Sequence, residues 1–126
     1  MANIIVYPTN EAAGLSARRG AHFGRAHYYT VVTVDDQGVI ESVRSIKNPG
    51  HEAGGCGSAI ENIRMLGADT LVVSGIGMSP LKGFLQKGMV VLYDNVSPTV
   101  DASLEALRSG KLSLMRPDMS CSHHAH

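Results

Sequence analysis

The sequence has few cysteines, no long hydrophobic run and no excess of charge of either sign. Its eleven lysines and arginines balance eleven aspartates and glutamates, and this argues against nucleic acid as a partner, because nucleic-acid binders usually concentrate a basic excess on one face. The longest apolar runs, such as "NIIVY" and "DTLVVSG", are far shorter than the roughly 20 residues that span a bilayer. The start "MANIIVYPTN" lacks the basic head and long apolar centre of a secretory signal. We therefore expect a cytoplasmic protein without nucleic acid or a membrane among its partners.

The two cysteines, Cys56 and Cys121, lie far apart in the chain and form no C-x-x-C pair. This spacing speaks against a disulfide framework and against a four-thiolate zinc or iron-sulfur site. Any metal or cluster that they bind therefore needs other ligands as well.

The length and composition suit one compact globular domain: 126 residues, of which 44% are hydrophobic and 17% charged. The apolar pattern predicts five strands, at 3–7, 28–36, 38–47, 70–75 and 89–94. It also predicts three helices, the first at 59–66. The second, at 79–87, has the cap pair Ser79 and Pro80 and carries Leu81, Phe84 and Leu85. The third, at 100–109, has the cap Thr99 and places Val100, Leu104 and Leu107 inward. The order βββαβαβα indicates an α/β domain over residues 1–110, with a five-stranded, mixed but mostly parallel sheet flanked by helices. A flexible tail that contains Cys and His, residues 111–126, follows it.

The strand order predicts where the chemistry gathers. If only the second strand runs antiparallel, the loops after the other four strands leave the sheet at one edge, which is where open α/β sheets bind ligands. That edge would collect both glycine-rich loops and the residues His22, Arg25, His27, His51, Cys56, Asp94 and Asn95.

The two glycine-rich loops are candidates for binding an anion. "GGCG" (Gly54, Gly55, Cys56, Gly57) and "GIG" (Gly75, Ile76, Gly77) leave backbone N–H groups free to point at a negative ligand, and the second leads into a helix N-terminus. The alternative is that the glycines only make tight turns between strand and helix, and no complete phosphate-loop motif is present.

Soft metal ligands cluster in two places. His22, His51 and Cys56, with His27 nearby, suit an open nitrogen–sulfur site, although a loop histidine is more often a hydrogen-bonded surface residue and Cys56 could be a small buried side chain. The end "CSHHAH" suits transient uptake of Zn, Cu or Ni by Cys121, His123, His124 and His126. A disordered end or an expression remnant is the alternative for this segment.

Enzymatic interpretations find less support. Ser74 in "VSGIG" is not in a G-x-S-x-G elbow, and the first strand carries none of the carboxylates that two-metal phosphoryl chemistry needs. We therefore expect no catalytic residues and no enzyme activity.

Four segments, "HFGRAHYYTVVTVD", "IKNPG" followed by "GGCG", "GADTLVVSGIG" and "VVLYDNVSPTVDASLEAL", resemble the dinitrogenase iron-molybdenum cofactor biosynthesis family, which includes NifX, NafY, the C-terminal domain of NifB and the orange proteins. The resemblance implies a ribonuclease H-like fold without nuclease activity. It also implies a carrier of an anionic metal-sulfur cluster, whether iron-molybdenum-cofactor-like, iron-sulfur or molybdenum-copper sulfide, that works with a cluster-donating or cluster-receiving protein. His22 stands where the family has its cofactor-binding histidine, within the segment that continues through Phe23, Gly24 and Arg25. Cys56 as a second ligand is an inference from this sequence alone.

Overall fold

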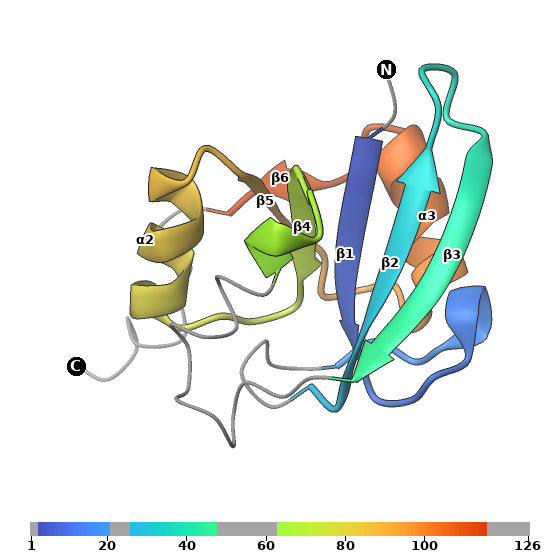
Figure 1. Ribbon diagram of the computed structural model, residues 1–126, viewed down its shortest axis with the longest axis horizontal. Coiled ribbons are helices and arrows are strands. Elements are labelled where there is room, and N and C mark those ends of the chain that lie inside the picture. Colours follow the sequence, from blue (N-terminus) through green and yellow to red (C-terminus); the bar gives the residue numbers. More distant parts are fainter. Residues whose placement is uncertain (1–2, 21–25, 48–62, 116–126) are drawn as a thin grey trace.

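The computed structural model describes residues 3–20, 26–47 and 63–115. Its elements follow the predicted alternation of strands and helices (Figure 1). They are β1 (Asn3–Thr9), the short 3-10 helix η1 (Gly14–Ser16), β2 (Tyr28–Val34), β3 (Ile40–Lys47), β4 (Thr70–Val73), α2 (Met78–Gln86), β5 (Val90–Tyr93), α3 (Val100–Arg108) and β6 (Ser113–Leu114).

One six-stranded sheet with the order β3-β2-β1-β4-β5-β6 organises the molecule. β1 is parallel to β4 and β4 to β5, whereas β2 is antiparallel to both of its neighbours, β1 and β3. Strands β1, β3, β4 and β5 therefore run in one direction and β2 in the other, as the sequence predicted.

The sixth strand corrects the predicted count of five. Ser113 and Leu114 pair antiparallel with the end of β5, and Met115 N–H donates to Val91 O at 2.8 Å. Residues 113–115, which the sequence placed in a flexible tail, therefore extend the sheet next to β5. The strand escaped prediction because two exposed residues carry no readable alternation of apolar and polar side chains.

The hairpin between β2 and β3 is confirmed, and its turn is fixed by one side chain. Asp35 Oδ1 accepts hydrogen bonds from the backbone N–H groups of Gln37 and Val39, both at 2.9 Å. Gly38 has φ +81, a left-handed conformation that is readily open only to glycine. The Asp and Gly positions thus specify a tight reversal.

Two apolar layers cover the faces of the sheet, with α2 and α3 on opposite sides (Figure 1). The alternation along each strand assigns side chains to these layers: Val6 belongs to the layer with α2, while its neighbours Ile5 and Tyr7 belong to the layer with α3. From α2, Leu81 and Phe84 are fully buried. Full burial of such a side chain contributes about 1.5–3 kcal/mol to folding, so these two layers supply most of the stabilisation.

Helix α2 starts earlier than predicted. Its N-cap is Gly77, so Ser79 is not the cap, and Pro80 lies within the first turn, where a missing N–H does no harm. The buried face of α2 consists of Pro80, Leu81 and Phe84, so Leu85 lies at the border of that face and is 40% exposed. The helix predicted at 59–66 lies mostly outside the described residues; residues 63–65 are helical.

Candidate functional site

The carboxyl ends of four strands meet at one edge of the sheet. β1 ends at Thr9, which pairs with Tyr28 at the start of β2, and Tyr28 in turn pairs with Lys47 at the end of β3. The last residues of β4 and β5, Val73 and Tyr93, pair with each other. The predicted gathering of strand ends is therefore present, and we refer to it as the carboxyl edge.

Two buried residues at this edge flank the segment 21–25. Gly20 N–H donates to Pro8 O at 2.9 Å, near the end of β1. A Cβ built on Gly20 would lie 3.7 Å from Ala26 Cβ and 3.5 Å from Asn10 Oδ1, so these residues are in close contact. Both Gly20 and Ala26 are buried. The chain thus leaves and rejoins the described structure at almost the same point of the carboxyl edge.

The "GIG" loop after β4 forms the start of α2. Gly75 and Ile76 are buried, and the Ile76 side chain packs in the layer with α2, so only its backbone can face a ligand. No side chain caps the N-terminus of α2, where the helix dipole and unpaired N–H groups favour an anion. An open hollow of about 790 Å³ adjoins this turn, lined by Gly77, Met78, Ser79, Pro80, Lys82, Gly83 and Gln86. Because Lys82 is exposed there, its ammonium group adds positive charge at the same place.

A buried ion pair lies on the other side of the carboxyl edge. The side chains of Arg19 and Asp94 are 2% and 3% exposed, and Arg19 Nη1 lies 3.6 Å from Asp94 Oδ2. Arg19 Nη1 also donates hydrogen bonds to the backbone oxygens of Asp94, at 2.8 Å, and Ser97, at 2.9 Å. The cation is therefore tied more closely to the turn after β5 than to the carboxylate itself.

The Asp94 carboxylate is held ionised by several donors. Oδ1 accepts the backbone N–H groups of Val96 and Ser97, both at 3.0 Å, and Oδ2 accepts the Ser103 hydroxyl at 2.7 Å. Burial alone would raise the pKa of Asp94, but the hydrogen bonds from Ser97, Ser103 and Val96 outweigh it and lower the pKa to about 2. Asp94 therefore carries its charge at any physiological pH.

Tyr7 lies close to this network, beneath α3. Burial raises the pKa of its phenol, and the nearby Arg19 opposes that shift. Its hydroxyl lies near Ser103 but has no partner within hydrogen-bond geometry, and Nε and Nη2 of Arg19 also have none.

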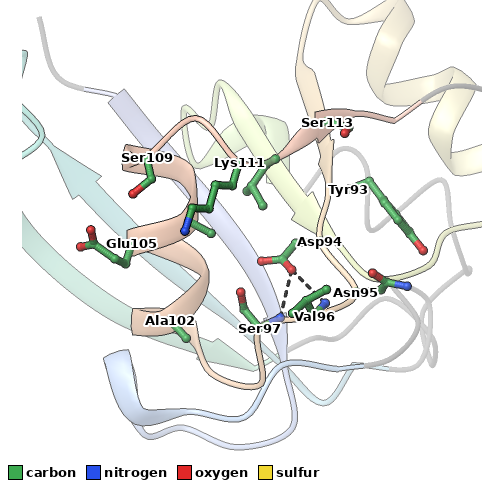
Figure 2. A pocket seen from close by; sticks show the side chains of 12 residues that line it. Tyr93, Asp94, Asn95, Val96, Ser97, Ala102, Glu105, Ser109, Lys111 and Ser113 are labelled. Atoms are coloured by element: carbon green, nitrogen blue, oxygen red, sulfur yellow. Dashed lines mark hydrogen bonds between the residues drawn. The ribbon is translucent and has the colours of Figure 1, made fainter.

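A second hollow, of about 540 Å³, lies between the turn after β5, α3 and β6 (Figure 2). Asp94 lines it, and the figure shows its bonds to the N–H groups of Val96 and Ser97. Glu105 and Lys111 also line this hollow, and both are exposed. It is a polar surface depression beside the buried pair.

Most of the residues predicted to bind the cluster or a metal ion lie outside the described residues. These are His22, Phe23, Gly24, Arg25, His51, Gly54, Gly55, Cys56, Gly57, Cys121, His123, His124 and His126. His27 is described and exposed, so it does not pack in the core. Within residues 3–20, 26–47 and 63–115, no group of three or more His, Cys, Asp or Glu side chains could hold a metal ion.

The Arg19–Asp94 pair was missed by sequence reasoning. Arg18 and Arg19 are adjacent in a polar stretch, yet Arg18 is exposed and pairs with Glu11 at 3.4 Å, while Arg19 is buried. No local signal separates the two, because the partner of Arg19 lies 75 positions away.

An open α/β sheet with ligand-accessible strand ends defines a broad class of binding domains. Within this class the chain belongs to the dinitrogenase iron-molybdenum cofactor family, whose model matches residues 4–110. No curated protein matches the chain significantly. In the part of the chain that the structure describes, no helix is long and apolar enough to cross a membrane.

Solved structures share the fold. The apo form of the orange protein from Desulfovibrio gigas is 19% identical with a TM-score of 0.76, covering 90% of this chain and 92% of that one. The crystal structure of PH0822 is 23% identical with a TM-score of 0.75, covering 89% and 96%. A putative NifB protein from Thermotoga is 19% identical with a TM-score of 0.71, covering 89% and 92%. At these identities the likeness concerns the fold.

Proposed function

We propose that this protein is a non-catalytic carrier that binds an anionic metal-sulfur cluster and passes it between a cluster-donating and a cluster-receiving protein in the cytoplasm. The observation that carries the proposal is the carboxyl edge, where the uncapped start of α2 and an open hollow of about 790 Å³ lie at the ends of the central strands. Family membership over residues 4–110 supports cluster handling in general.

The described side of this site suits a negatively charged guest. The first-turn N–H groups of α2 and the Lys82 ammonium group supply partial and full positive charge around the hollow. Metal sulfides carry negative charge on exposed sulfur atoms, which accept hydrogen bonds from such amides. The role of this surface is therefore to hold the cluster by its sulfides, without direct coordination of a metal.

We propose His22 and Cys56 as the metal ligands, with the backbone around Gly24 and Gly54–Gly57 completing the cradle. For His22 the support is its place in the chain, two residues after Gly20, which is anchored at the carboxyl edge. Two residues of chain span at most about 7 Å, and this limits how far His22 can lie from Gly20. For Cys56 the support is the chemistry of a thiolate between glycines, which suits soft metals.

The mixed sheet with β2 reversed supports the ribonuclease H-like assignment that the family resemblance implies.

Anaerobic reconstitution tests this function. Apo-protein is incubated with a thiolate-ligated [4Fe–4S] complex or with copper tetrathiomolybdate, passed through gel filtration, and analysed for metal, sulfide and visible absorption. We expect a coloured complex with at least one cluster. If the wild type retains neither cluster, the carrier function is wrong.

Matched variants test the ligands. His22→Ala and Cys56→Ser should each weaken retention and the double variant should lose it, whereas His27→Ala and Cys121→Ser should retain the cluster. Deletion of residues 120–126 separates the alternative, in which the chain stores or delivers Zn, Cu or Ni through its tail. That deletion should abolish ion uptake and leave cluster retention intact. Full retention by the double variant would refute the ligand assignment.

A further inference from the structure

The segment Ala17–Gly20 is fastened on both of its sides. On one side Gly20 N–H bonds Pro8 O at the end of β1. On the other, Arg19 N–H donates to Pro98 O at 2.9 Å, and Val100 N–H at the start of α3 donates to Ala17 O at 3.1 Å. This short stretch therefore bridges the end of β1 and the turn between β5 and α3.

The Arg19 side chain adds the part of this fastening that depends on residue type. Its Nη1 donates to the carbonyl oxygens of both Asp94 and Ser97, so one guanidinium group holds both ends of the turn after β5. A buried ion pair often adds little to stability when compared with well-packed apolar side chains of similar volume, and its best-attested use is to fix one geometry. Besides pairing these buried carbonyl oxygens, the Arg19 side chain therefore fixes the geometry of the turn.

We propose that Arg19 is a positioning residue for the carboxyl edge. It fixes the point at which the chain leaves that edge after Gly20, relative to the turn Asp94–Ser97. This inference rests on the proposed cluster-carrier function, because the chain between Gly20 and Ala26 carries the proposed ligand His22.

The charges of Arg19 and Asp94 make it possible to distinguish two roles for Arg19: positioning of the chain at the carboxyl edge, and electrostatic attraction of an anionic cluster. Arg19 and Asp94 are oppositely charged and, with a pKa of Asp94 of about 2, the pair is electrically neutral at working pH. If Arg19 merely attracted an anionic cluster, Asp94→Asn would strengthen binding, because it removes the compensating negative charge. If Arg19 acts by position, the same substitution weakens binding, because it loosens the grip on the turn.

The experiment measures how fast a bound cluster is lost from the full chain. The wild type, Arg19→Met, Arg19→Lys and Asp94→Asn are loaded with the thiolate-ligated [4Fe–4S] complex or copper tetrathiomolybdate, whichever the wild type retains. Loss is followed by visible absorption and visible circular dichroism in the presence of a chelator, at a temperature where far-ultraviolet circular dichroism shows every variant folded. Val34→Ala is the matched control, because Val34 is buried at the opposite edge of the sheet, where it pairs with Ile40.

We expect all three variants at positions 19 and 94 to lose the cluster about 10- to 100-fold faster, the range seen when groups that orient metal ligands are removed, with an altered circular dichroism band. Lysine is expected to fail because a point-like ammonium group does not reproduce the planar fork of donors. Val34→Ala should lose the cluster at the wild-type rate despite lower stability. If Arg19→Met does not fold, Arg19→Lys and Asp94→Asn still decide the question.

The outcomes separate two failures. Wild-type rates in Arg19→Lys together with slower loss in Asp94→Asn would overturn positioning while leaving the carrier function intact. Equal acceleration in Val34→Ala would also overturn it, since the effect would then follow stability alone. A wild type that retains neither cluster would overturn the carrier function, and this inference with it.

Discussion

The buried carboxylate of Asp94 makes a definite contribution to stability that depends on pH. Its pKa falls from 3.8 to about 2 in the folded protein. A shift of almost two units, at 1.36 kcal/mol for each, amounts to about 2.4 kcal/mol. Because the folded pKa is depressed, this stabilisation is fully present above pH 4 and is lost as the pH falls from about 4 to 2.

Urea unfolding of the wild type and of Asp94→Asn, at pH values from 6 to 2.5, measures this contribution. Asparagine does not titrate, so the difference in unfolding free energy between the two proteins should shrink by about 1.6 kcal/mol between pH 6 and pH 2.5, where the folded carboxylate is still partly ionised. Glu11→Gln is the control, because the pKa of Glu11 is also lowered by its hydrogen bonds with Arg18 but the side chain is at the surface. If the wild-type and Asp94→Asn curves remain parallel down to pH 2.5, the assigned hydrogen bonds do not stabilise the ionised form.

Three further substitutions test the fold by chemical denaturation. Gly88→Ala should cost about 1 kcal/mol through backbone strain alone, since Gly88 has φ +82 and nothing lies within 4 Å of an added Cβ; an unchanged midpoint would contradict the left-handed end of α2. Phe84→Ala should cost about 3–5 kcal/mol, because the side chain is fully buried, and a loss below 1 kcal/mol would place it outside the core. Tyr7→Phe should change stability by less than about 1 kcal/mol, because the hydroxyl has no hydrogen-bond partner; a large loss would reveal a bond to Ser103.

The strands of the sheet were predictable because their burial repeats along the chain. β2 alternates between the two apolar layers, with Val31 on one face and Val32 on the other, and β4 is a continuous apolar run covered on both faces. Strand directions followed from chain order alone, and with them the carboxyl edge. β6 was not predictable, because its two residues gain their conformation from pairing with β5 and have no pattern of their own.

The start of α2 shows a different limit. Gly77, Ser79 and Pro80 are each compatible with a helix N-terminus, so local preference offers adjacent solutions that differ little in energy. Tertiary packing decides among them: the helix buries Pro80, Leu81 and Phe84, and Leu85 lies at the border of that face. Boundaries of this kind depend on which face meets the sheet.

The buried arginine can be explained from the structure even though the sequence does not reveal it. The turn after β5 leaves the backbone oxygens of Asp94 and Ser97 without a strand partner, and buried carbonyl groups need a donor. One guanidinium group reaches both oxygens. An apolar side chain would remove the donor to Ser97 O and leave Asp94 O with only its hydrogen bond from the Ser74 hydroxyl, at 3.0 Å. Asp94 then offsets the charge that this solution introduces. The identity of residue 19 is thus dictated by a turn 75 positions away, and this is why reasoning from neighbouring residues did not find it.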